Sequence, residues 1–214
     1  MSAARTAGRL FYYVVRFFFR VVLTIYNRLS VRWLEELPRD GNVIVAGNHC
    51  SNLDPVVIGV AFPRQLRYFA KEELFRPFLF GNVIRVLGAI PVSRSDSASA
   101  AGALKGFLRL LEGGSDVLIF PEGGRSPEGR LMPLEEGVGL IASHSGVSIL
   151  PVYVRGSHDA MPPGSALVRP KKLSVTFGRL IKITPELAKG RDARQKIVAA
   201  LSESLHELED RSLP

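Results

Sequence analysis

The chain of 214 residues contains a single cysteine, Cys50. One cysteine cannot form an internal disulfide bond or a zinc site built from several cysteines, so a reducing compartment is expected. The motifs G-x-S-x-G, G-x-x-x-x-G-K-[ST] and H-E-x-x-H are also missing from the sequence. Serine hydrolase, P-loop nucleotide hydrolase and zinc protease activity therefore have no support, and no metal is expected.

Acidic residues are missing from the first 34 positions, which carry six arginines. Over the whole chain, 28 basic residues outnumber 20 acidic ones and give a net charge of +8. This charge indicates an anionic partner, either nucleic acid, a membrane surface or an acidic protein. Apolar residues make up 46% of the sequence, enough for one globular domain with a buried core.

The N-terminal segment lacks an unbroken apolar run of the about 18 residues that a membrane span needs. No signal-peptide cleavage pattern follows it either. Arg9, Arg16, Arg20 and Asn27 recur at helical spacing and predict one polar stripe on an otherwise apolar, aromatic helix. We expect this helix to lie in a membrane interface with its arginines at lipid phosphates. A soluble core helix with solvated arginines is the alternative, and a nucleic-acid-binding arm is disfavoured because water would cover the apolar surface.

Beyond this helix, short β-branched runs alternate with helical patterns. The alternation predicts an α/β fold, a single domain with a mixed, largely parallel sheet flanked by helices. Strands are expected at 42–48, 66–70, 88–93, 147–156 and 172–178, and a strand that runs into a glycine-rich turn is expected at 116–124. Helices are expected at 54–62, 72–87, 97–114, 135–146 and 192–211. Ligands of such sheets gather where strands end and helices begin.

His49 and Asp54 follow the strand predicted at 42–48. Asp54 precedes Pro55, which is typical of a helix start, so its carboxylate is expected to cap the helix and also bind the ring of His49. That contact would fix the tautomer and leave the other ring nitrogen free to take a proton. The alternative is a structural histidine beside an ordinary N-cap. Cys50 is a poor nucleophile partner for His49, because neighbours in an extended chain point to opposite sides.

Cationic residues lie at three other predicted strand ends. The glycines of 119–126 expose backbone N–H groups, and Arg125 offers a two-pronged guanidinium, an arrangement that suits phosphate. Glu122 is expected to anchor this arginine or a substrate hydroxyl. With Arg94 and Lys71, Arg125 would form a cationic pocket for a phosphomonoester. A glycine turn with a surface Arg–Glu pair, and solvated cations, are the alternatives.

Four blocks in order resemble the glycerolipid acyltransferases, the family of 1-acylglycerol-3-phosphate acyltransferase. The blocks are NHCSNLD with its H-x4-D spacing, GAIPVSR, FPEGGRS and ILPVYV, with AKEEL between the first two, from about residue 42 to 156. The arginine-striped helix is similar to the membrane-docking helices of compact bacterial members. Two departures lie beside the expected phosphate site: Ser93, where the family more often has an acidic or amide residue, and Gly124, where it usually has threonine.

The resemblance implies a membrane-docking helix over residues 1–30 and a catalytic domain over 31–214. It implies that His49 is the general base and Asp54 its orienter, and that Pro151 shapes the acyl-donor side. The residues that it places at the acceptor phosphate are Glu122, Gly123, Arg125, Arg94 and Lys71.

The resemblance also implies a reaction. His49 would take the proton of the sn-2 hydroxyl of 1-acylglycerol-3-phosphate as this oxygen attacks an acyl thioester, and would return it to the leaving thiolate, giving phosphatidic acid. The expected partners are a lysophospholipid, acyl-CoA or acyl carrier protein, and an anionic membrane surface at the cytoplasmic face of the cell membrane, with no nucleic acid and no cofactor. Glycerol-3-phosphate or another lysolipid as acceptor, and a non-catalytic lipid-binding membrane protein, are the alternatives.

Overall fold

A computed structural model describes residues 2–92 and 100–212 of the chain. In this part of the chain, seven strands form one sheet in the order β1-β7-β6-β2-β5-β3-β4. The strands are β1 (Ser30–Trp33), β2 (Ile44–Gly47), β3 (Leu66–Lys71), β4 (Ala89–Val92), β5 (Asp116–Ile119), β6 (Ile149–Arg155) and β7 (Ser174–Phe177). Neighbouring strands pair in parallel except β6 and β7, which are antiparallel. The predicted α/β fold with a mixed, largely parallel sheet is confirmed.

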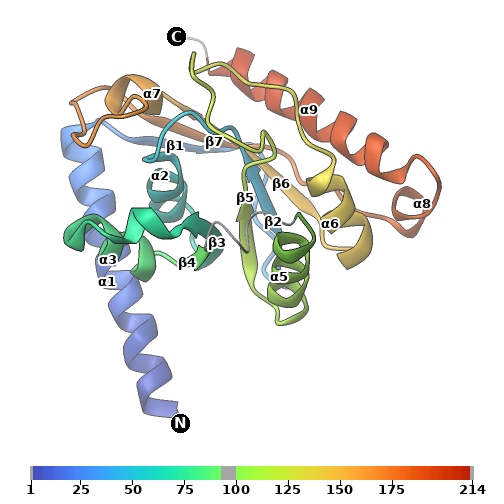
Figure 1. Cartoon of the computed structure of the whole chain (residues 1–214), viewed down its shortest axis with the longest axis horizontal. Helices are drawn as coiled ribbons and strands as arrows, with labels where there is room; N and C mark the ends of the chain where they lie inside the picture. The colour runs from blue at the N-terminus through green and yellow to red at the C-terminus, as the bar shows by residue number, and fades with distance from the viewer. Residues whose placement is uncertain (1, 93–99, 213–214) are drawn as a thin grey trace.

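Helices cover both faces of the sheet (Figure 1). One face packs against α1 (Ser2–Tyr26), α2 (Asp54–Ala61) and α3 (Phe78–Val86), the last preceded by a 3-10 turn, η1 (Glu72–Phe75). The other face packs against α5 (Ala100–Glu112), α6 (Gly137–Ser145) and α9 (Ala193–Arg211). Two short helices, α7 (Ser157–Ala160) and α8 (Pro185–Ala188), follow β6 and β7. The sequence patterns predicted the longer elements within a few residues and missed β1, α7 and α8.

Strand β2 lies at the centre of the sheet, where it pairs with β5 on one side and with β6 on the other. Every residue of β2 and β5 is buried, as expected for parallel strands covered on both faces. Ala46 of β2 is in register with Ile119 of β5 and with Pro151 of β6. The chain segments that leave β2 and β5 therefore start from the same edge of the sheet, next to the carboxyl-terminal half of β6.

The polar stripe of α1 faces the domain, which corrects the orientation expected from the sequence. Asn27 is fully buried, and its side-chain amide donates to the carbonyls of Arg169 and Lys171. Arg16 and Arg20 are half-buried, and Arg20 donates to a backbone carbonyl at the end of α2. The side chain of Arg9 lies outside the described part. Long polar side chains suit this face because they reach carbonyl groups that an apolar face would leave unbonded.

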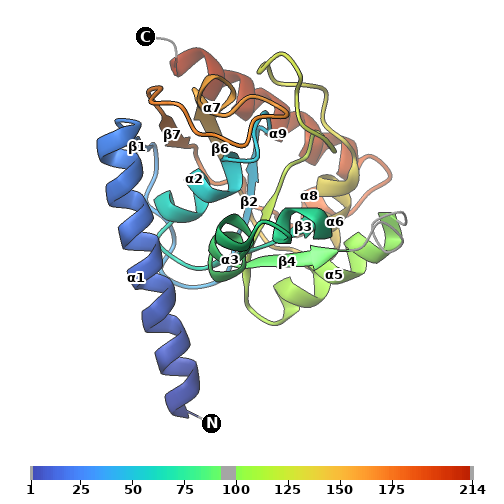
Figure 2. The same cartoon turned by 60° about the vertical axis from the view of Figure 1, so that its left-hand side comes forward.

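The opposite side of α1 is apolar and exposed along its described length, and the N-terminal end of the helix projects beyond the sheet (Figure 2). The exposed large side chains of α1 are Leu10, Phe11, Tyr13, Val14, Phe17, Phe18, Val21, Val22, Ile25 and Tyr26. Among the described residues, no helix is long and apolar enough to cross a membrane.

Candidate active site

His49 and Asp54 meet at the carboxyl end of the central strand. His49 lies two residues beyond β2, and Asp54 is the first residue of α2. The loop between them folds back, so that Nδ1 of His49 is 3.0 Å from Oδ2 of Asp54. The side chain of Asp54 is fully buried, whereas that of His49 is 18% exposed. The contact that the spacing predicted between these two side chains is present.

One oxygen of Asp54 accepts three hydrogen bonds from the loop before α2. Oδ2 accepts the backbone N–H groups of Cys50 and Ser51, each at 2.8 Å, in addition to the ring of His49. The N-cap position of α2 is Leu53, and no side chain caps the helix. The carboxylate therefore binds the loop before the helix, and the predicted capping role is wrong. Oδ1 is buried and has no hydrogen-bond partner among the described residues.

The loop that follows β5 fixes the backbone and the ring of His49. The N–H of His49 donates to Oε1 of Glu122 at 2.5 Å, and its carbonyl accepts the N–H of Ser126 at 2.7 Å. The imidazole stacks on the ring of Phe120, with centroids 4.0 Å apart and planes 18° apart. Hydrogen bonds at the N–H and the carbonyl of His49 fix its backbone, and stacking on Phe120 leaves the imidazole little freedom to rotate.

Glu122 holds two loops together. It is buried, Oε1 binds His49 as above, and Oε2 accepts the N–H of Met132 at 2.8 Å. Burial raises the pKa of this carboxyl, while the two N–H donors act to lower it. Its carboxylate contacts these backbone donors, and the predicted contact with Arg125 is not formed.

Two further residues, Asn48 and Ser51, hold the loop that carries His49. They were not predicted from the sequence as part of the site. Asn48 is buried and forms a pair of hydrogen bonds with the backbone of Val154 in β6, at 2.9 and 2.7 Å. Ser51 is fully buried, and its hydroxyl donates to the carbonyl of Met161 at 2.6 Å. Their sequence signal is a polar side chain close to an apolar run, where burial requires a bonding partner.

His49 lines a cavity of about 920 Å³. Nε2 forms no hydrogen bond with the described residues, so this nitrogen is available to a ligand. Gly123, Gly124, Arg125 and Lys71 also lie in the wall. Arg125 and Lys71 are exposed, and neither side chain bonds another described residue. The wall thus joins an imidazole to two cationic groups, although the acidic Glu73 lies in it as well.

A second part of the cavity wall is apolar. Phe69, Phe80, Ile84 and Phe107 come from β3, α3 and α5. Helix α5 approaches β3 closely because it has glycine at position 106, where a Cβ would lie 2.5 Å from the ring of Phe69. A cavity with one polar and one apolar portion suits an amphipathic ligand.

Pro151 and Cys50 do not line the described cavity. Arg94 and Ser93 are outside the described residues. Pro151 is buried in β6 beside β2, and its carbonyl accepts the N–H of Gly178, so it lies within the sheet and not in the described cavity wall. Cys50 is buried with its sulfur 3.3 Å from the hydroxyl of Ser157, and burial raises its pKa to about 12. This thiol is neutral near pH 7 and a poor nucleophile.

The geometry supports proton transfer at Nε2. A carboxylate at Nδ1 favours the tautomer with the proton on Nδ1, and it stabilises the imidazolium that forms when Nε2 accepts a proton. Guanidinium and ammonium groups in the same wall suit an anionic ligand. Among the described residues, no cluster of three or more His, Cys, Asp or Glu side chains has the arrangement of a metal site.

Comparison with known proteins identifies a family that matches this chain. A model of the acyltransferase family matches residues 28–155. The 1-acyl-sn-glycerol-3-phosphate acyltransferase of Bacillus subtilis is 29% identical over 160 residues, which are 74% of this chain and 76% of that protein. The chloroplastic enzyme LPAT1 of Arabidopsis thaliana is 28% identical over 155 residues, 72% of this chain. The chain spans 43% of LPAT1 and 45% of a similar chloroplastic protein of Brassica napus.

The fold is also found in a solved structure. The crystal structure of the 1-acyl-sn-glycerophosphate acyltransferase PlsC from Thermotoga maritima aligns with all of this chain and 86% of that chain, with a TM-score of 0.77 and 24% sequence identity. At this identity, the likeness concerns the fold.

The role of Glu122 can be tested by stability. Glu122→Gln places an amide NH2 against one of the two buried N–H donors, so the free energy of unfolding in urea should fall by about 1–3 kcal/mol. The matched control Arg125→Ala, three residues away and exposed, should change it by less than about 0.5 kcal/mol. Equal stability of the two variants would contradict the loop-holding role of Glu122.

Proposed function

This chain belongs to the acyltransferase family, and we propose that it moves a fatty acyl group from a thioester to the sn-2 hydroxyl of 1-acyl-sn-glycerol-3-phosphate, making phosphatidic acid. The observation that carries the proposal is the contact between His49 and the buried Asp54, with His49 in the wall of a cavity that Arg125 also lines. The similar proteins of Bacillus subtilis and Arabidopsis thaliana, both named 1-acyl-sn-glycerol-3-phosphate acyltransferases, support the same acceptor.

The proposed reaction needs one base and no covalent enzyme intermediate. Nε2 of His49 takes the proton of the sn-2 hydroxyl while this oxygen attacks the thioester carbonyl carbon, and Asp54 stabilises the imidazolium. The tetrahedral intermediate then expels the thiolate as the carbon–sulfur bond breaks. The imidazolium returns its proton to the thiolate, which leaves the free thiol, the diacyl product and a neutral His49.

The acceptor phosphate is proposed to bind at Arg125 and Lys71, with the backbone of Gly123 beside them. Arg94, which the family resemblance adds to this group, lies outside the described residues. Glycerol-3-phosphate or another lysolipid would use the same groups and remains an alternative acceptor. A lipid-binding protein without activity is the rival function, and it is disfavoured because binding alone has no use for an imidazole held by a buried carboxylate.

The donor is proposed to be acyl-CoA or acyl carrier protein. Coenzyme A is polyanionic and the carrier protein is acidic, so either suits a chain of net charge +8. The acyl chain is proposed to lie in the apolar part of the cavity, against Phe80 and Phe107.

We further propose that α1 docks the protein on the cytoplasmic face of the cell membrane. Its exposed side presents aromatic and aliphatic side chains, including Phe17 at 69% and Ile25 at 77% exposure. A continuous row of exposed aromatic and aliphatic side chains on a helix without acidic residues is typical of interfacial membrane helices.

The general base is tested by removing it. His49→Ala should lower turnover by roughly 10²–10⁴, because the hydroxyl loses its proton acceptor. The measurement is diacyl product formed from one labelled acyl thioester and a panel of lysolipids that includes 1-acylglycerol-3-phosphate. His144→Ala, an exposed histidine on α6, is the matched control and should retain full activity. A His49→Ala enzyme with near-normal turnover would refute the proposed role.

The phosphate contact is tested by Arg125→Lys. A single ammonium cannot reproduce the two-pronged guanidinium contact, so the acceptor KM should rise roughly tenfold, which is about 1.4 kcal/mol, with little change in the thioester KM. Arg130→Lys, exposed in the same loop, serves as the control. If only the thioester KM changed, Arg125 would belong to the donor site.

Membrane docking is tested by sedimentation with vesicles of phosphatidylcholine and phosphatidylglycerol. The double variant Phe17→Ser and Ile25→Ser should bind at least roughly 100-fold more weakly, since each removed side chain contributes about 1.5–3 kcal/mol of apolar burial. Thr24→Ser on the same helix is exposed and should bind as the unchanged protein does. Undiminished binding of the double variant would exclude this face as the docking surface.

A further inference from the structure

Among the described residues, the exposed large hydrophobic side chains occur in three segments. Within the described part of the chain they occur on α1, at the first two residues of α3, and at Leu167 in the loop before β7. Phe78 and Leu79 of α3 are 84% and 76% exposed, and Phe78 is the most exposed of all. Two adjacent large apolar side chains in water are unfavourable unless a partner covers them.

The corner that presents these two residues is rigidly built. The N–H of Gly81 donates to the carbonyl of Pro77 at 2.7 Å, which closes the first turn of α3. A Cβ at Gly81 would lie 2.4 Å from the carbonyl oxygen of Phe75, so only glycine lets η1 pack this tightly on α3. The guanidinium of Arg85 lies 5.2 Å from the centre of the Phe75 ring and ties the two segments further. These contacts hold the first turn of α3 in place. We call its two exposed residues, Phe78 and Leu79, the apex.

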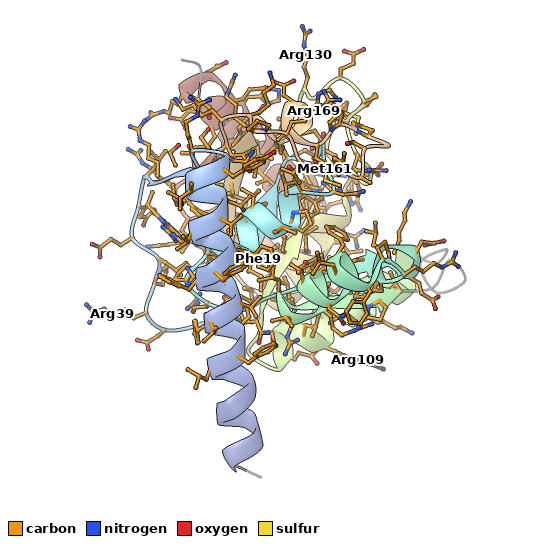
Figure 3. All side chains as sticks on the ribbon, turned by 90° about the vertical axis from the view of Figure 1, so that its left-hand side faces the viewer. Phe19, Arg39, Arg109, Arg130, Met161 and Arg169 are labelled. Atoms are coloured by element: carbon orange, nitrogen blue, oxygen red, sulfur yellow. The ribbon has the colours of Figure 1, made fainter. Side chains whose placement is uncertain are left out.

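Helix α3, which carries the apex, is next to α1 and lines the cavity. Helices α1 and α3 are in contact, and α3 lies beside the middle of α1 (Figures 1 and 3). Further along α3, Phe80 and Ile84 line the cavity that contains His49. One short helix thus has an outer end in solvent and an inner side in the cavity wall. Leu167 lies near the other end of α1, where the hydroxyl of Tyr26 donates to the carbonyl of Val168.

The charge around these segments matches an anionic lipid surface. Residues 2–29, 74–87 and 161–173 contain none of the 20 acidic residues, while Glu72 and Glu73 of η1 lie directly before the second range. Arg76 and Arg85 flank the apex, and both are exposed. Arginine beside an exposed aromatic side chain suits a membrane interface, where the guanidinium meets phosphates and the ring enters the acyl region.

We propose that Phe78 and Leu79 are a second membrane-insertion point, which enters an anionic bilayer beside α1. The proposal rests on the proposed docking of α1. One helix alone leaves the domain free to rotate about the helix axis, whereas two insertion points fix its orientation. Because α3 also lines the cavity, insertion of its tip brings the cavity to the lipid surface, where a lysophospholipid resides.

Fluorescence quenching tests the insertion directly. The chain has one tryptophan, Trp33, which stacks on Phe177 with ring centroids 3.9 Å apart. Phe78→Trp adds a second at the apex, and Glu203→Trp adds one at an exposed position on α9 as the control. Each variant and the unchanged protein are mixed with vesicles of brominated phosphatidylcholine and phosphatidylglycerol. The added emission at position 78 should be quenched by the bromine atoms, and that at position 203 should not.

Other outcomes overturn the proposal. Binding to vesicles without quenching at position 78 would contradict the insertion of α3 while leaving the docking of α1 standing. No sedimentation with vesicles would contradict both. Emission at position 78 that shifts to the blue without vesicles, as protein concentration rises, would show that a second copy of the chain covers the apex.

A paired substitution gives a second measurement. The double variant Phe78→Ser and Leu79→Ser should partition to the same vesicles at least roughly tenfold more weakly, because two apolar side chains no longer enter the bilayer. Asn82→Ser, exposed on the same helix, should partition as the unchanged protein does. Equal partition of the double variant and the control would overturn the proposal.

Discussion

The site depends on one buried carboxylate oxygen. Oδ2 of Asp54 accepts hydrogen bonds from the ring of His49 and from two successive backbone N–H groups, at 2.8 to 3.0 Å. A buried carboxylate is stable only if donors compensate for its lost hydration, so the loop must fold around this oxygen. The same requirement places the imidazole. Folding of the loop and orientation of His49 are therefore one event.

The strand order makes this arrangement possible. Since β2 lies between β5 and β6, the loop that carries His49 is bounded by the loop after β5 and by the end of β6. Glu122 joins it to the first of these, and Asn48 joins it to the second. Each of these buried side chains bonds backbone groups, so the rigidity of the site comes from side chains that need not contact a ligand.

Local sequence patterns predicted the parts of the structure that depend on short-range chemistry. Apart from β1, the strands and the long helices followed from apolar periodicity, and the contact of His49 with Asp54 followed from their spacing before a helix. The partners of Glu122 were not predictable, because Met132 approaches it only through the fold of a glycine-rich loop. The predicted orientation of the arginine stripe on α1 was wrong for a related reason. Polarity favours water on an isolated helix, but here the carbonyl groups of a distant loop bind Asn27.

The central claim is that Asp54 holds the proton of neutral His49 on Nδ1, which leaves Nε2 as the base at the cavity. The chain has four histidines, so their ring nitrogens can be resolved by NMR after labelling with 15N-histidine and assigned with a His49→Gln variant. The most direct measurement is the pair of ring 15N chemical shifts of His49 in the neutral imidazole. A protonated Nδ1 with an unprotonated Nε2 is the predicted result. The opposite tautomer, with the proton on Nε2, would contradict the claim.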